Sequence, residues 1–335
     1  NKSVTLDLEA FLIKYMSADK KFKLQNSNCG LQNYNYYQKE MYEQEFEKIW
    51  LKLRKMGLVV NDLKVIENSE LFKYSPYKSL TSEQYMIIND ILRTLRKDII
   101  NKDSSIFMVH GCSGTGKTIL GIYLVMLLNQ VKNVKQLKDE MEEVDQSLSE
   151  ILKIASVTDD LKIGLVVPTD NLRNSIKNVF RNINGLKSTM VLSPSSLVNS
   201  DKMYDLLIVD EAYRLRRRKN MTQYRTFDRN NNKFNLGKQG TELDWILLKS
   251  KHRIFFYDDS QTIKPTDVRK EDFDRLKLRD HYHFYHLQTQ LRCLKGGNQY
   301  VDYIKSLFSQ KPPKLKINFK NYDLKIYDDV NDMIE

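Results

Sequence analysis

Short apolar runs alternate with longer segments of helical periodicity through most of this chain. Each run is a few residues long and ends in Gly, Pro, Asp or Ser, as buried parallel strands do. The four runs nominated as strands are Ile106 to His110, Gly164 to Val167, Leu206 to Val209 and Arg253 to Tyr257. Polar residues follow each of them. The alternation predicts an α/β fold, with a parallel sheet covered by helices on both faces and active-site chemistry at the carboxyl ends of the strands.

The first part of the chain has a different pattern. Two helical patterns, Leu6 to Met16 and Tyr36 to Met56, are rich in aromatic and charged residues, and Gly57 ends the second. We find no chemical motif among them. Residues 1–75 are therefore predicted to form a helical N-terminal region of unknown role, followed by a linker at Tyr74 to Tyr77.

Two insertions interrupt the α/β pattern. Residues 129–160 carry a helical stripe that indicates an amphipathic helix or hairpin packed on the domain surface, with a partner coiled coil as the alternative. The apolar positions of this stripe are Leu137, Met141, Val144, Leu148 and Ile151. Residues 214–240 are rich in Arg, Asn and Lys and have little hydrophobic periodicity. We expect a flexible basic loop there.

Composition narrows the class of protein. The 335 residues suggest about two domains, and a formal net charge of +11 with a pI near 9.2 favours a polyanionic partner. Three scattered cysteines are too few for a disulfide framework or a four-ligand zinc site, which points to a reducing cytoplasm. The longest apolar run, Ile119 to Leu128, is too short to span a membrane. We expect a cytoplasmic protein without a membrane partner.

A phosphate-binding loop of the Walker A type follows the first nominated strand. Its eight residues are Gly111, Cys112, Ser113, Gly114, Thr115, Gly116, Lys117 and Thr118, which match G-x-x-x-x-G-K-[ST] without a departure. The glycines let backbone N–H groups turn inward around an anion, and the following helix adds its positive dipole end. Lys117 is expected to reach the β and γ phosphates, and Thr118 to offer its hydroxyl to Mg²⁺. The loop predicts a P-loop NTPase that binds ATP.

Two further strands end in residues suited to nucleotide hydrolysis. Asp210 and Glu211 follow the strand Leu206 to Val209; we assign Asp210 to Mg²⁺ and Glu211 to the base that orients water, with a helix-capping role for Asp210 as the alternative. Gln261 follows the next strand and is expected to sense the γ phosphate, unless the segment is only a capped turn. Arg292, after a further strand, is our candidate arginine finger.

The whole pattern resembles the Schlafen group 3-like DNA/RNA helicase domain of bacterial proteins, a member of superfamily one. The resemblance covers residues 78–335 and rests on the P-loop and on several short stretches. These are I-V-D-E-A-Y-R-L from Ile208, T-E-L-D-W-I-L from Thr241, F-F-Y-D-D-S-Q ending at Gln261, and Gln290 to Cys293 followed by Gly296, Gly297 and Tyr300. The resemblance implies two RecA-like lobes with ATP between them. Some members carry a nuclease or another defence-related module upstream, which would be a partner of this chain.

Further expectations come with this resemblance. Gln84 lies where superfamily-one helicases keep a glutamine that reads adenine, although Thr81, Ser82 and Gln84 also fit an ordinary helix cap. Residues 78–290 would form the first lobe and 291–335 the start of a second. After Tyr300 we recognise neither the remaining nucleic-acid motif nor the late arginine motif. We therefore expect an incomplete second lobe and weak hydrolysis by this fragment.

Candidate nucleic-acid contacts are less specific. Thr169 follows the second nominated strand, where superfamily-one proteins contact the backbone, and Arg214, Arg216 and Arg217 begin a basic run directly after the acidic pair. A solvated charge run is the alternative for the arginines. The run from His281 to His286 invites a metal hypothesis, because alternate histidines share one strand face. No third ligand has a recognisable spacing, so an ordinary aromatic strand is favoured.

The main functional hypothesis is an ATP-dependent helicase or translocase core acting on DNA or RNA, which we expect to be single-stranded. The alternative is an ATP-dependent switch that regulates an attached effector, such as a nuclease in phage defence, without unwinding. Both need the P-loop and the acidic pair, but only the motor needs Gln84 and a polynucleotide track. A scaffold with a degenerate nucleotide pocket is disfavoured, because every core ATP residue is present.

Overall fold

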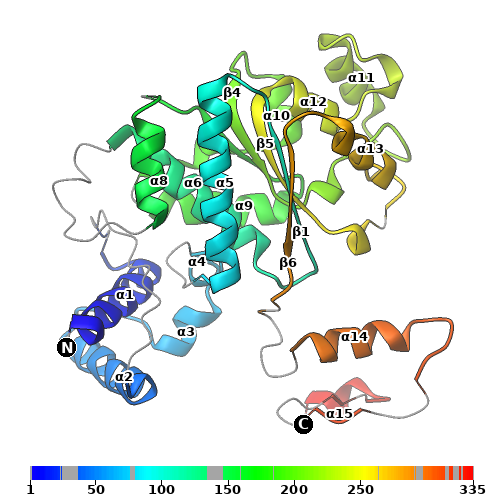
Figure 1. Cartoon of the computed structure of the whole chain (residues 1–335). Helices are drawn as coiled ribbons and strands as arrows, with labels where there is room; N and C mark the ends of the chain where they lie inside the picture. The colour runs from blue at the N-terminus through cyan, green and yellow to red at the C-terminus, as the bar shows by residue number, and fades with distance from the viewer. Residues whose placement is uncertain are drawn as a thin grey trace.

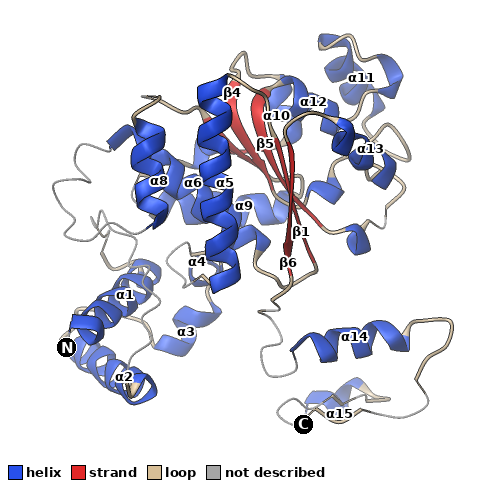
Figure 2. Cartoon of the chain, viewed as in Figure 1, coloured by secondary structure: helices blue, strands red, loops and turns tan. Residues whose placement is uncertain are grey.

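The fold is an α/β core with additional helices at both ends of the chain (Figure 1). The computed structural model describes residues 2–22, 24, 37–75, 80–133, 146–158, 160–183, 185–262, 264–289, 291, 297–313, 317–319, 324–325 and 327–334. Figure 2 shows the strands gathered in one sheet with helices around it. This arrangement confirms the α/β fold with a parallel sheet that the alternating pattern predicted.

The described residues form one six-stranded sheet in the order β3-β2-β4-β5-β1-β6, and every pairing is parallel. The strands are β1 Ile106–Gly111, β2 Ile163–Val166, β3 Val191–Leu192, β4 Tyr204–Val209, β5 Ser250–Tyr257 and β6 Tyr282–Leu287. The four nominated strands and the aromatic strand are therefore confirmed to within a few residues. The pattern missed β3, because a two-residue strand carries no periodicity of its own.

Alternate residues of each central strand point to opposite faces of the sheet. In β1, Phe107 and Val109 pack into the larger hydrophobic cluster, whereas Ile106 and Met108 pack into the second. The larger cluster is covered by α5 Ser82–Asn101, α6 Lys117–Asn129, α8 Gln146–Ala155 and α9 Asp170–Asn182. The second is covered by α10 Pro194–Val198, α12 Glu242–Leu248 and α13 Lys270–Asp274. Burial on both faces explains why the strands are almost continuously apolar.

The N-terminal region packs onto the same core. It consists of α1 Lys2–Asp19, α2 Lys39–Lys55, α3 Leu63–Asn68 and α4 Glu70–Lys73. Tyr15 and Trp50 pack with their ring centroids 5.8 Å apart and belong to the cluster that also contains Phe107 of the sheet. A hydrogen bond of 2.7 Å from Ser175 of α9 to Glu70 ties α4 to the α/β core. The helical prediction is confirmed here, and the apolar core is continuous across the expected boundary.

The expectation of a flexible loop at residues 214–240 is wrong. This segment contains α11 Tyr224–Lys233 and short 3₁₀ turns, and its side chains enter a small core of their own. The rings of Phe227 and Trp245 of α12 pack 4.8 Å apart. Buried Asn231 donates hydrogen bonds of 2.9 and 3.0 Å to the carbonyls of Gly237 and Gly240, and it accepts one from the Trp245 indole at 2.7 Å. These long-range contacts replace the missing hydrophobic period, so sequence periodicity could not reveal them.

The insertion at 129–160 is helical where it is described. In α8, Ile151 is fully buried, and Ser147 donates a 2.9 Å hydrogen bond to Asn89 of α5, as expected for a helix packed on the domain surface. The stripe positions Leu137, Met141 and Val144 lie outside the described residues.

The last described segments are α14 Gly297–Leu307 and α15 Val330–Ile334, which lie beyond the end of β6 (Figure 1). Among the helices that the structure describes, none combines the length and apolar character needed to cross a membrane.

Candidate nucleotide-binding site

The phosphate-binding loop joins the end of β1 to the start of α6. Gly114 and Gly116 have φ values of 89° and 82°, in the left-handed region that glycine adopts without strain. A Cβ on Gly116 would also lie 2.5 Å from the Gln84 amide nitrogen, so a larger residue would displace this amide from the Thr115 carbonyl. The loop therefore holds its backbone in the curved form that presents N–H groups to an anion.

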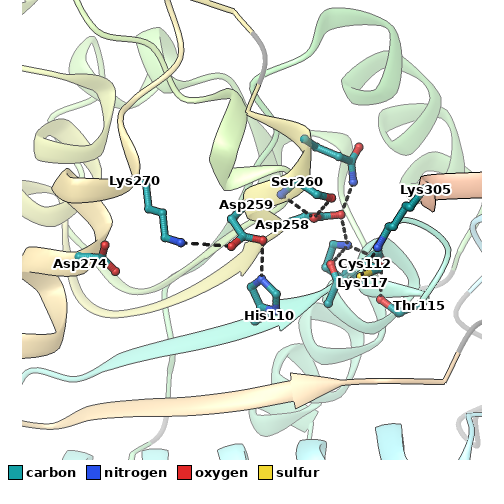
Figure 3. Close-up of polar contacts among 12 residues, drawn as sticks. His110, Cys112, Thr115, Lys117, Asp258, Asp259, Ser260, Lys270, Asp274 and Lys305 are labelled. Carbon is teal, nitrogen blue, oxygen red and sulfur yellow. Dashed lines mark hydrogen bonds and ion pairs between the residues drawn. The ribbon is translucent and has the colours of Figure 1, made fainter. Parts of the chain in front are cut away.

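Lys117 lies folded over the loop. Its Nζ donates to the carbonyls of Gly111 at 2.5 Å and Cys112 at 2.9 Å, and it lies 3.8 Å from Asp258 Oδ2 (Figure 3). The side chain is only 9% exposed. Its ammonium group is thus held at the mouth of the loop by two carbonyls and a carboxylate from the end of β5.

Asp210 and Thr118 meet at the floor of the site. Asp210 is 1% exposed, and burial raises the pKa of its carboxyl to about 6, against a lowering by the hydrogen bond from Thr118. Its Oδ2 is buried without a hydrogen-bond partner in the described part of the chain. A buried carboxylate oxygen without a partner beside a hydroxyl suits a hard cation with oxygen ligands. The residues therefore fit the Mg²⁺ that the P-loop implies.

Glu211 is held in a defined position beside this pair. Its backbone adopts φ 48°, a left-handed conformation that costs a non-glycine residue about 1–3 kcal/mol. The Glu211 N–H donates to Asp210 Oδ1 at 3.0 Å, and Thr169 donates to Glu211 Oε2 at 2.7 Å. Thr169, predicted to contact nucleic acid, is thus engaged with the candidate base. The Glu211 side chain lines the P-loop cavity.

A series of polar contacts, ending in an ion pair, joins Glu211 to Lys117. Tyr213 OH lies 3.3 Å from Glu211 Oε1 and donates to Gln261 Oε1 at 3.0 Å. Gln261 Nε2 in turn donates to Asp258 Oδ2 at 2.5 Å, the oxygen that faces Lys117. Burial and the neighbouring carboxylates raise the pKa of Tyr213 well above its ordinary value, so it remains a donor. Neither Tyr213 nor Asp258 was assigned a role from the sequence, although both lie inside the quoted stretches.

Asp259 is directed away from the Lys117 ammonium. A hydrogen bond from His110 lowers the pKa of its carboxyl, and Lys270 lies 3.4 Å from its other oxygen (Figure 3). The two neighbouring aspartates after β5 therefore have different partners, and of the two it is Asp258 that faces the lysine of the P-loop.

These groups surround a cavity of about 490 Å³. It is lined by Lys73, Tyr74, Ser113, Gly114, Gly116, Lys117, Thr118, Ile119, Asp210, Glu211, Tyr213, Gln261 and Leu291. Lys73 and Tyr74 come from the end of α4, in the region where the sequence offered no motif. Their part in the cavity depends on how α4 packs against α9, which no local spacing encodes.

Gln84 lies under the P-loop as part of a capping box. Its Oε1 accepts the Thr81 N–H at 3.1 Å, while Thr81 Oγ1 accepts the Gln84 N–H at 3.2 Å. Its Nε2 donates to the Thr115 carbonyl at 3.0 Å. The capping interpretation is confirmed. Adenine recognition stays a prediction, and it would require the amide to exchange these partners.

The segment after β6 is anchored beside the P-loop. Glu83 accepts the backbone N–H groups of Gln288 and Thr289 at 2.9 and 3.0 Å, and the Leu291 N–H donates to the Gly114 carbonyl at 2.8 Å. Arg292, the candidate finger, lies outside the described residues. Farther along, Lys305 of α14 approaches Cys112 Sγ at 3.6 Å (Figure 3).

The basic run after the acidic pair is largely ion-paired. Arg214 pairs with Asp267 at 3.3 Å and Arg216 with buried Glu242 at 2.8 Å. Arg217 instead lines a cavity of about 580 Å³ between α12 and α13, called the basic groove below. Its charged lining residues are Arg217, Arg218, Lys219, Lys238, Arg269, Arg275 and Arg279, against Asp244 and Asp272. The groove, more than the first two arginines, has the charge excess expected of a polyanion site.

Comparison with known proteins gives one family. The family described as Schlafen group 3, DNA/RNA helicase domain, matches residues 104–335. A search of curated proteins finds no match.

Two solved structures are similar to parts of the chain. The first is AMPPCP-bound DnaA from Aquifex aeolicus, with 15% sequence identity and a TM-score of 0.30. The match covers 78% of this chain and 59% of the DnaA chain. The second is a DNA replication initiation factor, with 13% sequence identity and a TM-score of 0.30. The match covers 70% of this chain and 54% of that protein's chain. The chain thus spans less than two thirds of either protein. With the P-loop, the buried acidic pair and the matched span of 104–335 together, this chain belongs to the Schlafen group 3 DNA/RNA helicase domain family.

Proposed function

We propose that this chain is the ATP-hydrolysing core of a DNA or RNA helicase or translocase that works with Mg²⁺. One observation carries the proposal: hydrogen bonds and an ion pair connect Glu211, Tyr213, Gln261, Asp258 and Lys117 along the wall of a single cavity. A change in phosphate contacts at Lys117 can therefore be passed to the carboxylate that orients water. Such coupling is what an ATP-driven motor or switch requires.

Each residue has a proposed task in hydrolysis. Lys117 leaves its carbonyl partners to neutralise the β and γ phosphates, and the loop N–H groups bind the same oxygens. Thr118 and Asp210 hold Mg²⁺, which when bound neutralises charge on the phosphate oxygens. Glu211 accepts a proton from the attacking water. Gln261 reports the γ phosphate through Tyr213, and Tyr74 offers a ring for the base or ribose.

Arginine or lysine from the second lobe would complete the charge at the transferred phosphate. Arg292 is the proposed finger, supported by the contact of the preceding Leu291 with the P-loop Gly114. Lys305 is a second proposed cation, because its ammonium already lies 3.6 Å from Cys112 Sγ.

The proposed polynucleotide surface is the basic groove. Two of its arginines, Arg269 and Arg275, share the single carboxylate of Asp272, at 3.2 and 3.4 Å, so at least one positive charge of this trio is not balanced within it. Phosphate backbones bind such excess charge through release of counterions, which makes the affinity fall steeply with salt.

The experiment that tests the catalytic proposal is steady-state ATPase activity with and without single-stranded DNA or RNA. We expect polynucleotide to stimulate the wild type and Lys117→Ala to lose activity by at least about 100-fold, the scale on which phosphate-site groups act. Full activity of Lys117→Ala would refute the assignment. ATPase activity indifferent to every nucleic acid would refute the motor and favour the ATP-dependent switch that regulates an effector.

The groove has a matched test. Replacing Arg217, Lys219 and Lys238 by Ala should weaken single-stranded nucleic acid binding, and the slope of log affinity against log salt should fall by about 1 for each phosphate that the variant no longer binds. The control replaces exposed Lys52, Lys55 and Lys64 of the N-terminal helices, which removes the same charge elsewhere. Equal weakening by both triple variants would show that only net charge matters and would exclude the groove as the track.

A further inference from the structure

Four metal-ligating side chains gather at the end of the sheet opposite the P-loop. Asp98 belongs to the end of α5 and Asp103 to the turn after it, while His281 directly precedes β6 and His283 lies near its start. They precede or open their strands, whereas the P-loop follows β1 at its carboxyl end. The register that pairs Ile106 with Tyr282 brings these two chain segments, which are far apart in the sequence, into contact.

The distances within this cluster are too long for hydrogen bonds. Asp98 Oδ1 lies 3.7 Å from His281 Nδ1, Asp103 Oδ2 lies 3.6 Å from His281 Nε2, and Asp98 Oδ2 lies 3.6 Å from His283 Nε2. Hydrogen bonds between nitrogen and oxygen are about 2.7–3.2 Å long. The side chains therefore converge without satisfying one another.

Two of the facing atoms are buried and unsatisfied. Asp98 is 5% exposed, and both its Oδ2 and the Nε2 of His283 lack a hydrogen-bond partner among the residues that the structure describes. The His283 ring stacks on Phe107 at 5.1 Å, which orients its nitrogen toward Asp98. Buried polar atoms without partners are costly, so the buried end of the cluster is not a completed ion pair.

The spacing suits a tetrahedral transition-metal ion. Two ligands that each lie about 2.1 Å from a tetrahedral ion are about 3.4 Å apart, close to the 3.7 Å between Asp98 Oδ1 and His281 Nδ1. One ligand atom from each of Asp98, Asp103 and His281 lies within 4.8 Å of the other two. The second nitrogen of His281 can donate to a neighbouring carboxylate, as metal-bound histidines do. Mixed imidazole and carboxylate ligands favour Zn²⁺ over Mg²⁺ or Ca²⁺.

We propose that Asp98, Asp103 and His281 bind a Zn²⁺ ion, with His283 holding the second oxygen of Asp98. The ion would fasten the carboxyl end of α5 to the start of β6. The opposite end of the same helix carries Glu83 and Gln84, which contact the segment after β6 and the P-loop. This site is independent of the ATP site and of the proposed helicase activity.

The test is zinc binding by the full chain after treatment with a chelator and its removal. We titrate Zn²⁺ against a chromophoric competitor. We expect the wild type to bind one Zn²⁺ ion per chain, and both His281→Gln and Asp103→Asn to lose this binding. The expected weakening is at least about 100-fold, beyond the 10–100-fold typical of groups that only orient a ligand. His286→Gln is the matched control, because His286 lies on the same strand without an aspartate partner among the described contacts.

Two further measurements make the outcome decisive. Nucleotide binding and the circular dichroism spectrum should be unchanged in the variants, which separates loss of zinc from loss of fold. Co²⁺ in place of Zn²⁺ should give the visible absorption of a tetrahedral site in the wild type and in His286→Gln only. Absence of stoichiometric zinc from the wild type, or wild-type affinity in His281→Gln and Asp103→Asn, would overturn the proposal.

Discussion

Replacing Asp210 by Asn should stabilise the nucleotide-free protein while abolishing its use of Mg²⁺. Burial raises the pKa of this carboxyl from 3.8 to about 6, a shift of about two units. At about 1.36 kcal/mol per unit, the ionised carboxylate lowers the free energy of unfolding by up to about 3 kcal/mol above pH 6. Asparagine keeps the shape and carries no charge. For a chain of 335 residues the difference corresponds to a rise in Tm of about 4 °C.

The sign of the pH dependence makes this prediction specific. The folded state binds the proton of Asp210 more tightly than the unfolded state, so wild-type stability from this group falls as pH rises from about 4 through about 6. Thermal unfolding of both proteins without Mg²⁺ should show a difference at pH 7.5 that shrinks below pH 6. Mg²⁺ with ATP should then raise the Tm of the wild type alone. The reasoning would be refuted if the variant were less stable than the wild type at pH 7.5, or if the difference in Tm between the two proteins did not change with pH.

Three other substitutions test separate parts of the structure. Tyr213→Phe removes the hydroxyl between Glu211 and Gln261. The kcat for ATP hydrolysis should fall about 10-fold, which is equivalent to the loss of one hydrogen bond, while KM and Tm stay unchanged. A large change in KM would contradict a coupling role. Gly116→Ala should abolish binding of a fluorescent ATP analogue, whereas Gly57→Ala, also at positive φ but with open space around it, should not. Asn231→Ala should lower the free energy of unfolding in urea by about 2–4 kcal/mol, with exposed Asn232→Ala nearly neutral.

The sequence predicted those parts of the site that follow directly from strand ends. The P-loop and the pair Asp210 and Glu211 are each contiguous, and their strands are apolar enough to be recognised alone. Parallel strands bring their carboxyl ends to one edge, so the convergence of these groups followed from the fold class. Gln261 reached the same cavity for the same reason.

Contacts between distant segments were beyond the reach of sequence pattern. Tyr74 lines the cavity because α4 packs on α9, and Asn231 orders α11 through a buried partner on α12. Asp98 stands beside His283 because α5 and β6 lie together, although the pattern offered no third ligand for the histidines. Each of these depends on packing between elements, whereas spacing within one element reports only its own faces.

The position of β5 between β1 and β4 fixes the distance between the P-loop and the acidic pair Asp210 and Glu211. β1, which leads into the P-loop, and β4, which ends before Asp210, are separated by two strand spacings of about 4.8 Å each. The distance between these two strands is therefore about 9.5 Å, and it is set by the backbone hydrogen bonds of the sheet. That distance depends on no loop. A peripheral segment such as α11, which packs in a small core of its own, could therefore be exchanged, shortened or fused to another domain without altering the gap that a triphosphate must bridge.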